Sequence, residues 1–190
     1  MIQRFLKAKH WQLFLLTFGL PFIAQLISFM FMFNNRDNAS AFAAFGLFGV
    51  VMILFCAVLY GWLWSIAIGL QTAIPENIRL NIKRFKIFFL FPIVYFFVFI
   101  LFAISMFGPN MNPSIFAVII PLHVFAMFCM FYNLYFVAKT IKTAELQKKV
   151  SFGDFAGEFF LIWFYPVGIW FVQPKINEIA KNSELNSEIY

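Results

Sequence analysis

Residues 75–86 read PENIRLNIKRFK, and this stretch is the most strongly charged interruption between two long apolar runs of the chain. Charged side chains are costly in hydrocarbon, and short loops rich in Lys and Arg stay on the cytoplasmic side of a membrane. Arg79, Lys83, Arg84 and Lys86 therefore predict a segment among lipid headgroups that orients the runs on either side. Two forms remain open for it: a short interfacial helix whose apolar face rests on the membrane, or a solvated basic loop.

The composition excludes an ordinary soluble domain. Of 190 residues, 63% are hydrophobic and 12% are charged, whereas soluble domains hold about 25% charged residues. We expect an all-α integral membrane protein, a four-helix bundle in one domain over residues 1–174, followed by a polar tail at 175–190 that frays. The net charge of +6 lies beside the apolar runs, which predicts the lipid bilayer and its anionic headgroups as partners, and no nucleic acid.

Four uncharged runs are long enough to cross a membrane as helices. They cover residues 11–33, 41–70, 87–107 and 115–138. The first run is too long for a signal peptide, which predicts a retained anchor. Pro21 lies near its middle and is expected to bend it, because proline removes a backbone hydrogen bond.

The basic residues predict the orientation. If the N-terminus is cytoplasmic, the three cytoplasmic segments hold three, four and four Lys or Arg residues, and the two external turns hold only Arg36. This asymmetry favours a multi-pass membrane protein with a cytoplasmic N-terminus.

The segment at 155–173 reads FAGEFFLIWFYPVGIWFVQ and does not fit a simple span. Glu158 interrupts it, Pro166 and Gly168 stand in its middle, and the part after Glu158 would cover about 22 Å as a helix against about 30 Å of hydrocarbon. A bent interfacial or re-entrant element on the cytoplasmic side is favoured, and a fifth transmembrane helix is the alternative.

Within this region, residues 166–177 read PVGIWFVQPKIN. This ending resembles a tail shared by small uncharacterised polytopic membrane proteins of bacteria. The resemblance implies a bacterial inner membrane, and it implies no activity.

Small residues recur at every fourth position of the second run. Ala57, Gly61, Ser65 and Gly69 would form a shallow groove on one helix face, and such grooves let helix backbones approach closely. We expect this face to be buried against another helix.

His123 is the only ionisable side chain well inside one of the four runs, and such a residue needs a partner. Asn133 follows it on the same helix face, and Gln25 of the first run lies at a similar depth. We expect a buried His123 that is hydrogen-bonded near Gln25 and fixes helix register. The alternative is a polar point in a permeation or ligand pathway.

The remaining reactive residues offer little chemistry. Cys56 and Cys129 each lie inside an apolar run, where a thiol packs as a small hydrophobic group. No metal-ligand spacing, carboxylate pair or phosphate-binding loop is recognised, so no cofactor or metal is expected. The sequence favours a non-catalytic membrane protein, such as a small subunit or assembly partner of other membrane proteins. A small transporter or channel with a site at His123, Gln25 and Asn133 is the alternative, and an intramembrane lipid-modifying enzyme is less favoured.

Overall fold

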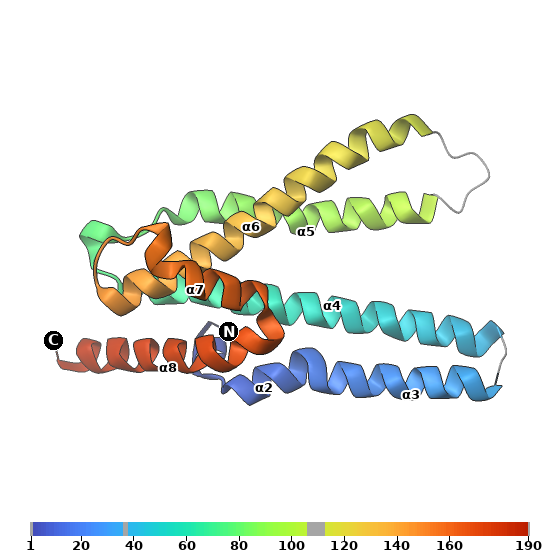
Figure 1. Ribbon diagram of the computed structural model, residues 1–190, viewed down its shortest axis with the longest axis horizontal. Coiled ribbons are helices and arrows are strands. Elements are labelled where there is room, and N and C mark those ends of the chain that lie inside the picture. The colour runs from blue at the N-terminus through green and yellow to red at the C-terminus, as the bar shows by residue number, and fades with distance from the viewer. Residues whose placement is uncertain (1, 36–37, 106–112, 190) are drawn as a thin grey trace.

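The computed structural model describes residues 2–35, 38–105 and 113–189, and all regular structure in these residues is helical. The α-helices are α1 (Ile2–Lys7), α2 (His10–Phe14), α3 (Leu20–Asn35), α4 (Asn38–Gly69), α5 (Ile82–Ser105), α6 (Phe116–Leu146), α7 (Phe152–Trp163) and α8 (Tyr165–Ile189). A π-helical turn (Leu15–Gly19) joins α2 to α3, and 3₁₀ turns lie at Leu70–Ala73, Glu76–Ile78 and Pro113–Ile115. Figure 1 shows these helices in an elongated molecule.

Four helical segments are long and apolar enough to cross a membrane, which confirms the number of spans predicted. They cover His10–Asn34, Gly46–Ala73, Ile82–Phe102 and Phe116–Leu146. Two of them extend beyond the predicted ends. Helix α5 begins within the basic stretch, and α6 continues past Ala138, so that part of each basic segment lies on a helix.

Pro21 shapes the first span. It lies one residue into α3, directly after the π-helical turn Leu15–Gly19. A proline cannot donate to the carbonyl one turn earlier, and a wider turn relieves that position. Within the π-helical turn, the Thr17 hydroxyl donates to the carbonyl of Leu13, at 2.7 Å.

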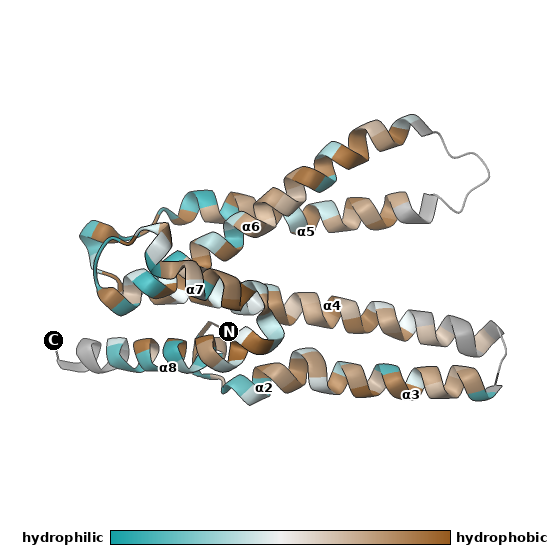
Figure 2. Ribbon diagram, viewed as in Figure 1, coloured by the Kyte–Doolittle hydropathy of each residue, from teal (hydrophilic) through white to brown (hydrophobic). Residues whose placement is uncertain are grey.

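The long helices form two antiparallel pairs, α3 with α4 and α5 with α6 (Figure 1). We call the end that holds Lys7, Arg79, Lys142 and Lys175 the basic end, and the end at which each pair turns the far end. Figure 2 shows polar residues gathered at the basic end and apolar residues along both pairs. The pairs separate toward the far end (Figure 1), so the four helices pack together chiefly at the basic end.

The hydrophobic core lies at the basic end. There Ile66 of α4, Ile141 of α6 and Ile176 of α8 are each fully buried in one cluster with Leu6 of α1 and Phe155 of α7. This cluster joins the two helix pairs, and it draws on both the first and the last helix of the chain.

The basic stretch at residues 75–86 is neither a single interfacial helix nor a plain solvated loop. It forms a 3₁₀ turn at Glu76–Ile78, an extended link, and the first turns of α5. Phe85 is fully buried in the core, while Arg84 and Lys86 are exposed beside it.

Helices α7 and α8 form a bent pair at the basic end. The chain turns at Phe164, and α8 runs back so that the C-terminus lies at the same end as the start of α7 (Figure 1). The pair is not among the helices long and apolar enough to cross a membrane. The segment that we expected to fray after residue 174 begins on α8, and Ile176 within it is fully buried.

Candidate functional site at the junction of α6, α7 and α8

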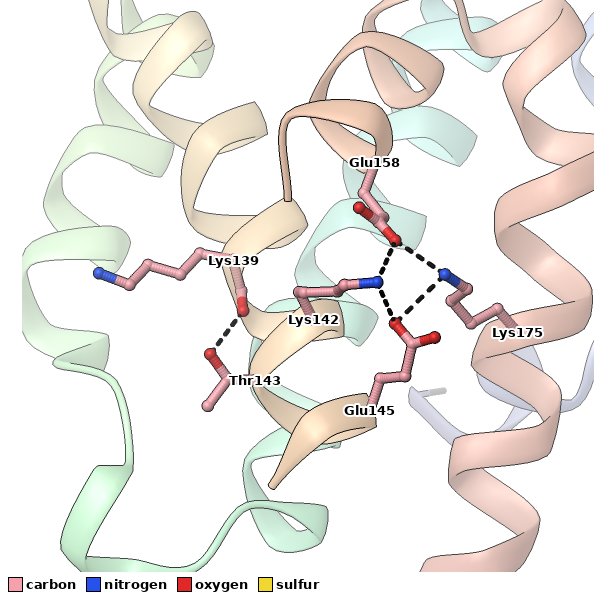
Figure 3. A network of polar contacts seen from close by, with 6 residues as sticks. All are labelled: Lys139, Lys142, Thr143, Glu145, Glu158 and Lys175. Carbon is pink, nitrogen blue, oxygen red and sulfur yellow. Dashed lines mark hydrogen bonds and ion pairs between the residues drawn. The ribbon is translucent and has the colours of Figure 1, made fainter. Parts of the chain in front are cut away.

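Four charged side chains meet where α6, α7 and α8 come together (Figure 3). The ammonium of Lys142 lies 2.9 Å from the carboxylate of Glu145 and 3.4 Å from that of Glu158. The ammonium of Lys175 lies 3.2 Å from Glu145 and 2.7 Å from Glu158. Each cation therefore contacts both anions, and the network links three helices without net charge.

Glu158 is the most enclosed member of this network. It is 7% exposed. Burial raises the pKa of its carboxyl, whereas the hydrogen bond from Lys175 and the nearby Lys142 lower it, and the resulting pKa lies below the ordinary value. The carboxylate is therefore ionised at neutral pH and held by two ammonium groups. Glu158, which interrupts the apolar pattern of 155–173, thus links α7 to α6 and α8 through ion pairs.

The start of α7 is fixed by its own cap. The backbone N–H and the hydroxyl of Ser151 both donate to the carboxylate of Asp154, at 2.7 and 2.8 Å. These hydrogen bonds lower the pKa of Asp154. A carboxylate in the first turn also interacts favourably with the helix dipole.

A second polar contact joins α8 to the N-terminal segment. The Gln173 amide is fully buried and donates to the carbonyls of Phe5 and Ala8, at 3.0 and 2.8 Å. Its oxygen accepts a 2.7 Å hydrogen bond from the indole N–H of Trp62. Four residues later, the Asn177 amide donates to the carbonyl of Ala8 at 3.1 Å. The break between α1 and α2 leaves backbone carbonyls without helical hydrogen-bond donors. The side-chain amides of α8 donate to these carbonyls.

A pocket of about 640 Å³ adjoins the charged network. Its walls include Glu145, Gln147, Lys175 and Glu178. Gln147 ends α6 in the left-handed backbone region, with φ of 53°, and its amide donates to the carbonyl of Ala73 at 2.8 Å. This side chain ties the end of α6 to the turn that follows α4.

The predicted partnership between His123 and Gln25 is wrong. His123 is exposed and lies 3.0 Å from the Tyr95 hydroxyl of α5. Gln25 belongs to the other helix pair, and its two buried amide atoms have no hydrogen-bond partner. Asn133 is buried and donates to the carbonyl of Phe88, at 3.2 Å. His123 and Asn133 thus each bind α5, and Gln25 does not join them.

The small-residue face of α4 is buried only toward the basic end. Ala57 is exposed, Gly61 is half-buried and Ser65 is 1% exposed. A Cβ atom at Gly69 would lie 2.7 Å from side-chain atoms of Leu6, so α1 packs closely there. The predicted burial is therefore wrong at Ala57 and is found at Ser65.

The basic residues predicted to contact headgroups differ in what their side chains contact. The Arg79 guanidinium donates to the carbonyls of Gln71 and Ile74, both at 3.1 Å, and braces the link between α4 and α5. The ammonium of Lys86 lies 5.9 Å from the centre of the Trp64 ring. Lys83 and Arg84 are exposed.

Three residues of α8 that had no predicted role, Gln173, Lys175 and Asn177, also bind other helices. The signal was present in the tail at 166–177, where three polar residues at alternate positions interrupt a run of apolar ones. Each makes hydrogen bonds or ion pairs to another helix. In the described residues, no group of three or more His, Cys, Asp or Glu side chains could hold a metal ion.

Four apolar helices of spanning length, with charged residues gathered at one end, define a polytopic α-helical membrane protein. Comparison of the chain with protein families, curated proteins and solved structures finds no match.

Proposed function

We propose that this chain is a non-catalytic protein of a bacterial inner membrane, a small subunit or assembly partner that binds other membrane proteins through the far halves of its helix pairs. The N-terminus and the basic end face the cytoplasm, in keeping with the charge asymmetry. Helices α7 and α8 enter the membrane from that side and return to it.

The observation that carries this proposal is the exposure of α4 in its far half. Val50, Met52, Ile53 and Leu54 are all exposed, at 40–56%. At 100° per residue these positions point around most of the helix, so the chain's own contacts cover only one side of it. A large apolar surface that a chain leaves uncovered on several sides is available to another transmembrane helix.

The far half of α5 has the same character. Val94, Phe97, Val98 and Leu101 are exposed. Together the two pairs present separated apolar helices, whereas the basic end is filled by its own core. Such a division suits a protein that folds around one end and offers the other to a partner.

The alternative, transport through a polar path, has less support. His123 and Asn133 bind α5, while Gln25 lies in the other helix pair. A continuous path would need these groups to face a common space, whereas Gln25 lies in a different helix pair from His123 and Asn133.

Photo-crosslinking tests the proposed partner surface. A photoreactive amino acid replaces Ile53 or Leu101 in the far half, and Ile87 near the basic end serves as a control with similar exposure. We expect both far-half positions to crosslink to the same protein, the control to give no such product, and native mass analysis of the extracted complex to show that protein bound.

A stable 22.2 kDa monomer with no protein bound would contradict the proposal. Crosslinks to lipid alone at both far-half positions would contradict it as well.

A further inference from the structure

A second pocket, of about 560 Å³, lies between α4 and α5 beside the N-terminal helix. Ile2 of α1, Tyr60, Gly61 and Trp64 of α4 and Phe89 of α5 line it. Its α4 and α5 walls fall within two of the four candidate spans. The pocket is therefore open to the hydrocarbon next to the basic end, and its volume lies within the range of roughly 300–1,000 Å³ of small-molecule sites.

The walls of this pocket are aromatic and held in place by ring contacts. The Phe89 ring lies 5.1 Å from the ring of Tyr60 and 5.1 Å from that of Trp64, measured between centres. Aromatic pairs at such distances stabilise one another's orientation. The two spans thus contact each other through these three rings, and the pocket lies beside the rings.

One polar group of the α4 wall already has a partner within its own helix. The Ser65 hydroxyl donates to the carbonyl of Gly61, at 2.7 Å, within α4. Gly61 itself has no side chain to fill the space. Most residues along the pocket are therefore apolar or aromatic, and Gln3 and Ser65 are the polar ones that line it.

A cation lies against one of the pocket's rings, on the side toward the basic end. Lys86 lies three residues before Phe89, one helical turn closer to that end. Its exposed ammonium is 5.9 Å from the centre of the Trp64 ring, a distance at which the ring face attracts a cation. This contact places a positive charge at the level where lipid phosphates lie.

We propose that the pocket binds an acyl chain of one anionic phospholipid from the leaflet at the basic end, and that Lys86 pairs with the phosphate of that lipid. The apolar walls take the chain, and the charge at the rim selects the headgroup. Lys and Arg near a membrane surface each contribute about 1 kcal/mol to attraction for anionic lipid. The ligand class thus follows from an apolar cavity with the ammonium of Lys86 against one of its rings.

Native mass spectrometry of the full chain tests this site. The protein in detergent receives equal amounts of phosphatidylglycerol and phosphatidylcholine with the same acyl chains. We expect more phosphatidylglycerol than phosphatidylcholine to be retained, and Lys86→Gln to reduce the phosphatidylglycerol retained roughly fivefold. Lys148→Gln, which removes an exposed charge between α6 and α7, away from the pocket, is the control and should retain the parent's preference.

A second pair of variants tests the cavity. Gly61→Leu fills it and should reduce retention of both lipids, whereas Gly49→Leu, where a side chain meets open space on the same helix, should change neither. Thermal unfolding shows whether each variant is folded, and if Gly61→Leu is not, the lysine pair decides. Equal retention of the two lipids by the parent, or retention by Lys86→Gln equal to that of Lys148→Gln, would overturn the proposal. So would a folded Gly61→Leu variant that holds as much lipid as the parent.

Discussion

At the scale of single residues, Gly168 permits the close approach of α7 and α8. A Cβ atom at this position would lie 1.6 Å from the carbonyl oxygen of Leu161, which no side chain can accommodate without moving the backbone. In the sequence, Pro166 and Gly168 indicated that this segment is not a straight span. The structure shows why a glycine is needed at position 168. The glycine allows the chain to reverse direction within a few residues of Phe164.

We therefore expect Gly168→Ala to force α7 and α8 apart and to lower the free energy of unfolding by about 1–3 kcal/mol, as overpacking does elsewhere. Gly157→Ala is the control, because a Cβ atom there meets nothing within 4 Å and alanine favours a helix. Thermal unfolding in detergent measures both. Equal unfolding temperatures for the two variants would show that the corner tolerates a side chain.

Residue partners were the part that the sequence predicted least well. His123 and Gln25 lie at similar depths in their spans, but depth alone does not make two helices neighbours. The hydroxyl of Tyr95, on the span that pairs with α6, was nearer. Hydropathy carries no information about which helices pair, so the hydrogen bond between Tyr95 and His123 could not be predicted from it.

At the scale of helices, the charged network fastens α7 and α8 to α6, and its strength depends on pH. The pKa of Glu158 is lower in the folded protein than its ordinary value of about 4.3. A carboxyl with a lowered folded-state pKa stabilises the fold above its unfolded pKa, and this stabilisation disappears as pH falls through the folded-state pKa.

We expect Glu158→Gln to lower the unfolding temperature near pH 7, because Lys142 and Lys175 then share only Glu145. The difference from the parent should shrink as the pH falls below the ordinary pKa of a carboxyl, and it should vanish once the pH is below the lowered pKa of Glu158 in the folded parent. Glu178→Gln, an exposed change on α8, is the control and should match the parent at neutral pH. A difference that stayed constant across this range would mean that the carboxylate's charge is not what stabilises the junction.

Helix positions were predicted well because they follow from apolar length, a property that the local sequence carries. Helix ends were predicted less well. Lys83, Lys139 and Lys142 were assigned to flanking segments, but helices α5 and α6 extend through them, since long charged side chains can remain on a helix and still reach the membrane surface.

At the scale of the whole molecule, the arrangement predicts on which side of the membrane each segment lies. If α7 and α8 enter and leave at the basic end, Ser151 before α7 and Asn182 on α8 share one side, and Asn34 at the end of α3 lies on the other. A fifth span would instead put Ser151 and Asn182 on opposite sides.

Single cysteines at these three exposed positions, in a chain whose Cys56 and Cys129 are replaced, can be labelled in intact cells and in opened membranes. We expect Asn34→Cys to react with an impermeant reagent from outside, and Ser151→Cys and Asn182→Cys to react only once the cytoplasmic side is accessible. Labelling of Asn182→Cys in intact cells would establish a fifth span and exclude the re-entrant arrangement.

The overall class of the molecule was predictable and its shape was not. Composition fixes an apolar, all-helical chain, but the separation of the two pairs depends on where the core forms. That core requires Leu6, Trp62 and Ile176 to meet, and contacts between residues so distant in sequence leave no periodic signal.

The contact between Gln173 and the N-terminal segment sets an order of events during synthesis. The amide and the carbonyl of Phe5 that it binds are 168 residues apart, so at about 5–20 residues per second the carbonyl waits roughly ten to thirty seconds for its partner. During that time the first helices are already in the membrane, and water must satisfy the open carbonyls. Assembly of the basic end is therefore completed only after the ribosome has delivered α8, which makes the last helix the one that closes the fold.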